Sequence, residues 1–251
     1  MLDVKNVNVR YENNLVVDDV SFHLQAGDWL MLVGANGAGK SSLLSAIAQS
    51  TPYTGEIKLG EIDAKSYRAK EFAKRVGVLS QVNHVEYDYS AQEVIRLGRY
   101  AHSSGVFSSL DMDGDRAVTD AIRATGLEQL KDKSVLTLSG GELQRVFLAQ
   151  VFAQEPELLL LDEPANHLDL LYQKQLFSTL SAWLAQGNRS IISVVHDLSL
   201  AMKYGTHVLL LHDGKNVAYG YPKDALQRDH LQMAYGMDVK KWMIELLDGW
   251  R

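Results

Sequence analysis

The stretch WLMLVGANGAGKSS, residues 29–42, joins a continuous apolar run to a glycine-rich segment. An unbroken apolar run such as WLMLV is typical of a parallel strand buried on both faces. GANGAGKSS fits the pattern G-x-x-x-x-G-K-[ST], and we expect a helix from about Lys40 to Gln49. A buried strand, this loop and a helix in succession predict a phosphate-binding P-loop in an α/β fold.

Each residue type in the loop suits the binding of a nucleotide phosphate. Glycines let backbone N–H groups close around phosphate oxygens, Lys40 supplies a positive charge, and the Ser41 hydroxyl suits Mg²⁺. The alternative is a glycine-rich turn with a solvated lysine, and the flanking strand and helix argue against it. The predicted nucleotide-binding residues of the loop are Gly34, Asn36, Gly37, Ala38, Gly39, Lys40, Ser41 and Ser42.

The composition excludes several classes of protein. The 251 residues carry 25 Lys and Arg against 31 Asp and Glu, a net charge of -6 without a basic cluster, so nucleic-acid binding is not expected. Cysteine is absent, which rules out disulfides and thiolate metal sites. The first residues, MLDVKNVNVRYEN, do not resemble a signal peptide, and no apolar run reaches the roughly 20 residues that cross a bilayer.

The rest of the chain alternates between strand and helix patterns. We expect short strands over 2–33 and a hairpin that turns at Asp213 and Gly214. Helical spacing from Leu176 to Leu184 places a C-cap at Gly187. Further strands are expected at 76–81, 158–162 and 190–195, and helices at about 90–99 and 115–125. This alternation predicts one α/β domain over 1–251, with a core at about 1–88 and 154–251 and an inserted helical subdomain at about 89–153.

Polar residues follow several of these strands at their carboxyl ends, where ligands of open α/β sheets bind. In LLLLDEP, Asp162 is a candidate magnesium ligand, and Glu163 is the candidate base or water-orienting group. His196 ends SIISVVH and can donate to a γ-phosphate, although a lone histidine is more often structural. Gln81 ends VGVLSQ, and its amide suits the magnesium shell, which is a weaker signal.

A second candidate anion site lies in LTLSGGELQRVFLAQ, residues 136–150. Ser139 followed three residues later by Glu142 is a capping box, so a helix is expected to begin here. Gly140 and Gly141 leave the backbone N–H groups of its first turn accessible to an anion. One chain is therefore predicted to carry two phosphate-binding elements.

Taken together, these motifs resemble the ATP-binding subunits of ABC transporters over nearly the whole chain. The P-loop, Gln81, LSGGELQR, LLLLDEP, NHLD at 166–169 and His196 occur in the order typical of that family. The resemblance implies a P-loop ATPase core with an N-terminal antiparallel β subdomain. It also implies ATP and Mg²⁺ as cofactors, with Ser41, Gln81 and Asp162 near the metal.

The resemblance explains the second phosphate element. In this family two subunits form a head-to-tail dimer, and the LSGG helix of one closes over the ATP held by the P-loop of the other. Ser139, Gly140 and Gly141 are thus expected to act in trans, and Asp169 to lie in a loop at the interface. Tyr11 matches the aromatic residue that stacks on adenine.

The kind of ABC protein is narrowed by what the sequence lacks. Chromosome-organising relatives carry a coiled coil between the P-loop and the acidic pair, and none separates Lys40 from Asp162 here. Translation factors of the family carry a second cassette and many exporters a fused membrane domain, and this sequence shows neither. VIRLGRYAHSSGVF, residues 94–107, resembles the LGRYPH segment of importers for iron–siderophore complexes, haem and vitamin B12, with Ala101 in place of proline. The tail HLQMAYGMDV at 230–239 resembles the same group.

The expected role is an ATPase subunit bound peripherally to the cytoplasmic face of the membrane. Permease subunits are expected to dock near 82–107, which includes Tyr87, Tyr89, Leu97, Tyr100 and Phe107, with Arg99 as a charged anchor. A substrate-binding protein is an indirect partner. The alternatives are an ATPase of another importer or a non-transport ATP switch.

Overall fold

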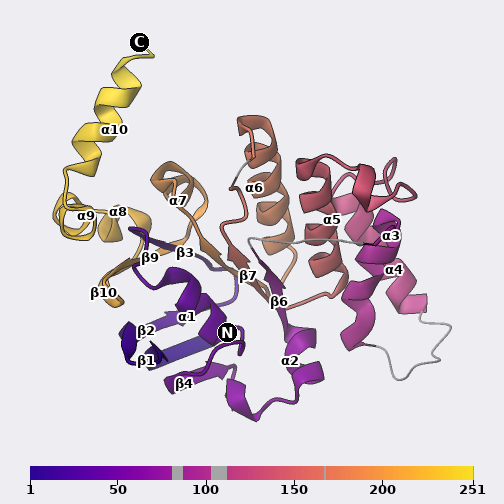
Figure 1. Cartoon of the computed structure of the whole chain (residues 1–251), viewed down its shortest axis with the longest axis horizontal. Helices are drawn as coiled ribbons and strands as arrows, with labels where there is room; N and C mark the ends of the chain where they lie inside the picture. The colour runs from indigo at the N-terminus through magenta and orange to yellow at the C-terminus, as the bar shows by residue number, and fades with distance from the viewer. Residues whose placement is uncertain (81–86, 103–111, 167, 251) are drawn as a thin grey trace. The chain divides into compact units, whose positions relative to one another are not determined.

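The computed structural model describes residues 1–80, 87–102, 112–166 and 168–250 (Figure 1). Its chain forms two compact units. Unit 1 comprises residues 1–66 and 190–251, and unit 2 comprises residues 67–189. None of the helices in the described part of the chain is long and apolar enough to cross a membrane.

Unit 1 begins with an antiparallel sheet in the order β2-β1-β4-β5. Alternate residues of β1 and β2, such as Val7, Val9 and Val20, are fully buried, which is the pattern of strands with one face on a core. The expected N-terminal antiparallel β subdomain is therefore confirmed. The strands are β1 (Leu2–Tyr11), β2 (Asn14–Leu24), β4 (Thr54–Leu59) and β5 (Ile62–Asp63).

The second group of strands in unit 1 carries the P-loop. β3 (Trp29–Gly34) runs parallel to β8 (Ser190–Val194) on one side and to β9 (His207–His212) on the other. All six residues of β3 are buried, as its unbroken apolar run predicts. β10 (Lys215–Gly220) pairs antiparallel with β9. The predicted hairpin is confirmed, since Asp213 (φ 45°) and Gly214 (φ 79°) form its turn.

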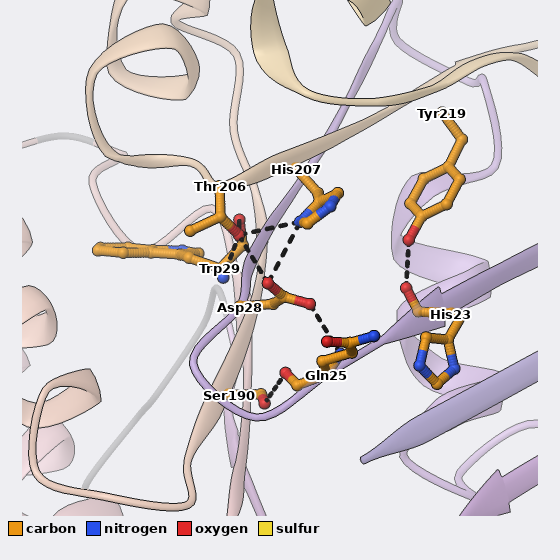
Figure 2. Close-up of polar contacts among 8 residues, drawn as sticks. All are labelled: His23, Gln25, Asp28, Trp29, Ser190, Thr206, His207 and Tyr219. Atoms are coloured by element: carbon orange, nitrogen blue, oxygen red, sulfur yellow. Dashed lines mark hydrogen bonds and ion pairs between the residues drawn. The ribbon is translucent and has the colours of Figure 1, made fainter.

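Side-chain hydrogen bonds hold the amino ends of these strands in place (Figure 2). The Trp29 amide donates to Thr206 Oγ1 at 2.9 Å, and the Gln25 amide donates to Asp28 Oδ2 at 2.7 Å. Ser190 Oγ donates to the Gln25 carbonyl oxygen at 2.8 Å. These contacts satisfy polar groups where β3, β8 and β9 begin. The loops that carry the candidate site residues follow the opposite, carboxyl ends of the strands.

The helices of unit 1 follow the strands, apart from a short 3₁₀ turn, η1 (Ala64–Ser66). α1 directly follows the P-loop and buries Leu43, Leu44 and Ile47. Its observed end lies two residues before the predicted one. The α-helices of this unit are α1 (Lys40–Ile47), α7 (Leu198–Tyr204), α8 (Pro222–Ala225), α9 (Arg228–Tyr235) and α10 (Val239–Asp248).

Unit 2 combines two parallel strands with a group of helices. β6 (Val76–Leu79) pairs with β7 (Leu158–Asp162), and both are mostly buried. α3 (Ala91–Arg96), α4 (Met112–Ala124) and α5 (Gly140–Ala153) pack against one another. The remaining elements are α2 (Ala69–Arg75), α6 (Leu170–Leu184) and the 3₁₀ turns η2 (Leu97–Ala101) and η3 (Val135–Thr137).

Two sequence predictions about helix ends can be compared with these elements. Both capping boxes are confirmed, at Ser90 for α3 and at Ser139 for α5. The predicted C-cap at Gly187 is wrong, because α6 ends at Leu184 and its C-cap is Ala185, whose amide bonds to the Ser181 carbonyl. Gly187 lies beyond the helix with φ 131°, a conformation that glycine tolerates. The division into a core and a helical subdomain at about 89–153 stays a prediction.

Candidate functional site

The P-loop depends on glycines at positions with little space and positive φ. φ is 146° at Gly34 and 93° at Gly39. A Cβ added at Gly34 would lie 2.2 Å from the Leu211 carbonyl oxygen, and one at Gly39 would lie 2.5 Å from that of Val16. Gly39 also N-caps α1 without a side chain, so the first N–H groups of the helix face the loop. Such a helix start favours anions.

The Lys40 ammonium lies across this loop. Its nitrogen is 2.9 Å from the carbonyl oxygens of both Gly34 and Ala35, and the residue is only 6% exposed. A largely buried ammonium at the N-terminus of a helix concentrates positive potential at one point. Unit 1 thus contains the predicted strand, glycine loop and helix with a buried lysine, and phosphate binding there stays a prediction.

Two further predicted residues of unit 1 lie close to the loop in the strand register. β3 and β8 align Leu32 with Val194, and His196 lies two residues beyond the carboxyl end of β8. Tyr11 pairs with Asn14 at the turn of the β1–β2 hairpin, and its ring is about half exposed. Because the Val16 carbonyl of this hairpin approaches Gly39, Tyr11 lies on the strand pair that borders the loop.

The acidic pair lies at the end of β7 in unit 2. Asp162 is its last residue, and Glu163 has φ 49°, a left-handed conformation that is unfavourable for glutamate. The Asn166 amide nitrogen donates to the Glu163 carbonyl oxygen, and Asn166 Nδ2 donates to Glu163 Oε2, both at 3.0 Å. Backbone strain of this kind occurs at functional sites, but Glu12, Asp19, Glu155 and Asp213 also have positive φ, so the hydrogen bonds from Asn166 are the more specific feature of Glu163.

Sequence reasoning missed the part played by Asn166 and by Gln144. Asn166 belongs to the quoted NHLD segment, but its link to Glu163 depends on a tight turn that the sequence pattern did not predict. Gln144 Nε2 donates to the Pro164 carbonyl and so connects α5 to the same turn. The one sequence signal for this contact is the polar Asn166 three residues after Glu163.

The start of α5 has the geometry that its capping box predicts. The Ser139 amide and Ser139 Oγ each lie 2.8 Å from Glu142 Oε2. The Ser139 backbone N–H, followed by its hydroxyl, lowers the pKa of Glu142 below its ordinary value of 4.5. A Cβ at Gly140 would meet open space, and one at Gly141 would lie 3.5 Å from the Tyr172 ring. The helix start is therefore accessible at Gly140.

Asp169 has a local structural role in addition to the predicted one. Its Oδ1 accepts a hydrogen bond from the Tyr172 amide at 2.9 Å, so it N-caps α6. The next two residues, Leu170 and Leu171, are 84% and 61% exposed. An exposed pair of leucines at a capped helix start is suited to contact with another protein.

The predicted site residues thus fall into two groups, one in each unit. Unit 1 holds Tyr11, the P-loop and His196, and unit 2 holds the α5 start, the acidic pair and Asp169. Gln81 lies outside the described residues. In the described part of the chain no three His, Asp or Glu residues cluster as a metal cage. Ser41 and Asp162 each carry a hard oxygen of the kind that Mg²⁺ binds, with waters and phosphate oxygens as its usual further ligands, and the magnesium site stays a prediction.

A strand–glycine loop–helix with a buried lysine defines a P-loop phosphate-binding protein, and comparison with known proteins specifies the family. The ABC transporter family model matches residues 17–166. The ferric enterobactin transport ATP-binding protein of Escherichia coli is 35% identical over 234 residues, covering 93% of this chain and 86% of that protein. The hemin import ATP-binding protein of Pseudomonas entomophila is 36% identical over 246 residues, with coverage of 95% and 94%. The chain belongs to the ABC transporter family.

A solved structure supports the same assignment. An inward-facing conformation of a metal-chelate type ABC transporter matches with a TM-score of 0.82 and 26% identity. The match covers 94% of this chain and 89% of that one. Its extent includes both compact units, so the ABC ATPase fold applies to the chain as a whole.

The LGRY segment in η2 divides into inward and outward residues. A Cβ at Gly98 would lie 2.0 Å from the Gln150 carbonyl oxygen, so only glycine lets η2 approach α5 this closely. Arg99 is 11% exposed at its side chain and donates to the Ala153 carbonyl at 3.0 Å and to Glu155 at 2.7 Å. Arg99 as an exposed anchor for a partner is therefore wrong, because it holds its own fold together.

The outward residues of η2 are exposed apolar and aromatic side chains, as predicted for a docking surface. Leu97 is 58% exposed and Tyr100 is 75% exposed, and Tyr87 and Tyr89 are exposed as well. Residues 82–86 and 103–107 of the predicted docking region, including Phe107, lie outside the described residues. The remaining surface is aromatic and aliphatic, as expected at the centre of a protein interface.

Proposed function

We propose that this chain is the ATP-binding and ATP-hydrolysing subunit of a membrane importer for an iron chelate, haem or a cobalamin-type compound. The ATPase part rests on the P-loop, in which Lys40 is buried beside the N-terminus of α1. The import part rests on relatives over nearly the whole chain whose names specify ferric enterobactin transport and hemin import. The LGRY segment favours the same group.

In the proposed reaction the protein binds the ATP phosphates and activates a water molecule. The P-loop amides and Lys40 hold the phosphates, and the Tyr11 ring stacks on adenine. Glu163 orients the attacking water and accepts its proton, while His196 donates to the γ-phosphate. Mg²⁺, held through Ser41 and Asp162 with Gln81 nearby, would neutralise phosphate charge when bound.

The proposed active assembly contains two copies of the chain. Each copy presents the α5 start, with Ser139, Gly140 and Gly141, to the ATP on the partner's P-loop, and Asp169 lies at this interface. Permease subunits bind the dimer from the cytoplasmic face of the membrane. The substrate-binding protein contacts only the permease.

The direct test joins the two parts of the proposal. The chain is co-expressed with a candidate permease and binding protein from the same genome, purified in detergent and reconstituted in vesicles. ATP-dependent uptake of a ferric siderophore, haem or cobalamin supports the proposal. ATP hydrolysis with binding to DNA or ribosomes, and no association with a permease, would identify a non-transport switch instead.

The exposed residues of η2 provide the first prediction. Tyr100→Ala combined with Leu97→Ala is expected to weaken co-purification with the permease and to lower uptake, because both side chains are more than half exposed. Basal ATPase of the isolated subunit should stay within about 2-fold, since exposed substitutions change stability by about 0.5 kcal/mol or less. Normal assembly and uptake by the double variant would show that η2 is not the docking surface.

The two capping boxes provide the second prediction, with a matched control. Ser139→Ala and Ser90→Ala each remove the same cap, so each is expected to cost about 1 kcal/mol in urea unfolding. Only Ser139→Ala should also lower ATP hydrolysis. Equal effects of both variants on hydrolysis would contradict a phosphate role for the α5 start.

The cap at Ser139 also predicts a pH dependence. Because the folded-state pKa of Glu142 is depressed, its stabilising effect is fully present above the ordinary value of 4.5 and is lost as pH falls through the folded pKa. The stability difference between wild type and Ser139→Ala should therefore be constant near neutral pH and shrink below pH 4.5. Unfolding curves measured over this range test the direction.

A further inference from the structure

A cavity of about 500 Å³ lies within unit 1 and is lined by residues from the region of α7, α8, α9 and α10. α7 contacts α8, and α9 contacts α10 (Figure 1). Ligand pockets in proteins have volumes of about 300–1,000 Å³, and this cavity falls within that range. In the described part of the chain, none of the predicted ATP-site residues lines it.

Most of the cavity wall is apolar. Three of its leucines belong to the buried core of unit 1, so this part of the wall is fixed by the fold. Two methionines complete the apolar wall, and their flexible side chains adapt to the shape of a bound molecule. The apolar residues are Leu198, Met202, Leu226, Leu231 and Met243.

Every charged residue that lines the cavity is a lysine. Lys203 lies on α7, Lys223 on α8 and Lys240 on α10, and all three are exposed. A lysine beside apolar surface covers it with its methylene stem and keeps its ammonium in water, so three positive charges lie at the edge of the cavity. Lys203 Nζ lies 5.3 Å from the centre of the Tyr204 ring, and in the described residues none of the three lysines forms an ion pair.

The acidic residues of the same helices do not neutralise these lysines. Asp238 pairs with Arg228, and Glu245 lies 3.9 Å from Lys241. The other acidic residues of α8, α9 and α10 do not line the cavity; they are Asp224, Asp229 and Asp248. The fold therefore gathers three positive charges around an apolar hollow, although the whole chain has a net charge of -6.

We propose that this cavity binds a small amphipathic anion, whose apolar chain or ring lies on the leucines and methionines and whose anionic group lies among Lys203, Lys223 and Lys240. The apolar part supplies most of the affinity, because each methylene removed from water strengthens binding by up to about 4-fold. The lysines supply the preference for negative charge. The site lies apart from the P-loop residues, and it does not depend on the proposed function.

One small molecule fits this site better than a membrane surface does. A helix that lies on a membrane buries one continuous apolar face in the lipid and carries its cations on the other face. Here the apolar residues come from four successive helical segments and surround a hollow, with the lysines on the same hollow. This arrangement matches the size and the two-part chemistry of a single ligand.

Binding of octanoate to the full chain tests the proposed site. Isothermal titration calorimetry should give a Kd of about 300 µM, as expected for a ligand of this size. Octanol and octyltrimethylammonium keep the same chain without the negative charge. Octanol should bind about 8-fold more weakly and octyltrimethylammonium more weakly still, because three ammonium groups attract the carboxylate and repel the cation. Lengthening the chain from hexanoate to octanoate should lower the Kd by about 3-fold per methylene.

Lysine-to-methionine variants separate the charge from the apolar stem. Lys203→Met, Lys223→Met and Lys240→Met should each raise the octanoate Kd by about 2-fold, and the triple variant by about 8-fold. The octanol Kd should stay within about 2-fold of wild type, since methionine keeps an apolar stem of similar length. Lys131→Met, an exposed lysine of unit 2, should change neither Kd.

Methionine-methyl NMR locates the bound molecule. On titration with octanoate, the Met202 and Met243 signals should shift with the Kd measured by calorimetry, whereas Met233, an exposed residue of α9 that does not line the cavity, should not shift. Met202→Asp should abolish binding, because it places a negative charge in the apolar wall. Met233→Asp is the matched control and should bind octanoate normally, with urea unfolding confirming that both variants are folded.

Three outcomes would overturn the proposal. Equal affinity for octanoate, octanol and octyltrimethylammonium would show that the lysines recognise no charge. Octanoate that shifts Met233 but neither Met202 nor Met243 binds elsewhere. Binding to phosphatidylcholine/phosphatidylglycerol vesicles that the triple lysine variant loses, without octanoate binding, would assign this surface to a membrane.

Discussion

Glu163→Gln is expected to lower ATP turnover by about 10²-fold or more while ATP binding is retained. Glutamine keeps the size and hydrogen-bonding reach of the side chain but cannot accept a proton from water. The interactions with ATP in the ground state are unchanged, so the loss should fall on kcat rather than on the ATP Kd. The variant should accumulate as an ATP-bound dimer, measurable by gel filtration and by single-turnover hydrolysis.

The local structure around residue 163 should be unchanged in the Glu163→Gln variant. Glutamine tolerates φ 49° no worse than glutamate does, and its side-chain oxygen can still accept from Asn166 Nδ2. Asn166→Ala should have a smaller effect on kcat, because it removes a hydrogen bond that positions the Glu163 carboxylate but keeps the carboxylate itself. Glu128→Gln, an exposed change elsewhere in unit 2, should leave turnover unchanged. A Glu163→Gln variant that hydrolyses ATP at the wild-type rate would exclude Glu163 as the base.

The fold was predictable where local patterns alone determine it. The apolar run of β3, the glycines of the P-loop and the serine–glutamate caps of α3 and α5 each act within a few residues. Their predicted elements are present in the structure with ends shifted by only a few residues. Gly187 failed as a C-cap because the α6 end depends on where the Ala185 amide finds its partner, which spacing alone does not reveal.

Features that depend on contacts between distant segments were not predictable. The sequence suggested that Arg99 faces a partner, but its guanidinium reaches the end of α5 and Glu155, which lie far along the chain. The bond from Asn166 to Glu163 and that from Gln144 to Pro164 likewise require the tertiary fold. A charged residue in a motif therefore indicates that a contact exists, but not which partner it has.

The second large effect is expected at the start of α5. Gly140→Asp should abolish ATP-dependent dimer closure and ATP hydrolysis, because it places a negative charge where the partner's γ-phosphate must approach. The fold should tolerate the change, since a Cβ at Gly140 meets open space and an acidic residue in the first helical turn is favourable. Gly140→Asn has the same size without the charge, and it should retain much more activity.

A mixture of two inactive variants then separates action in trans from action in cis. Lys40→Ala should weaken nucleotide binding, because the charge that faces the phosphates is lost, while its α5 start stays intact. In a mixed dimer with Gly140→Asp, one site combines two damaged elements and the other combines the intact P-loop of one chain with the intact α5 start of its partner. Random pairing of equal amounts should restore about a quarter of the wild-type sites.

The mixture gives opposite results under the two arrangements. If each chain used its own α5 start, no combination of the two variants would contain an intact site, and mixing would restore no hydrolysis. Recovery must also rise and fall with the ratio of the two variants, with its maximum at equal amounts, because only mixed dimers carry an intact site. Lys40→Ala mixed with a second P-loop variant such as Gly39→Asp is the matched control, since neither chain of that dimer has an intact P-loop and no activity should return.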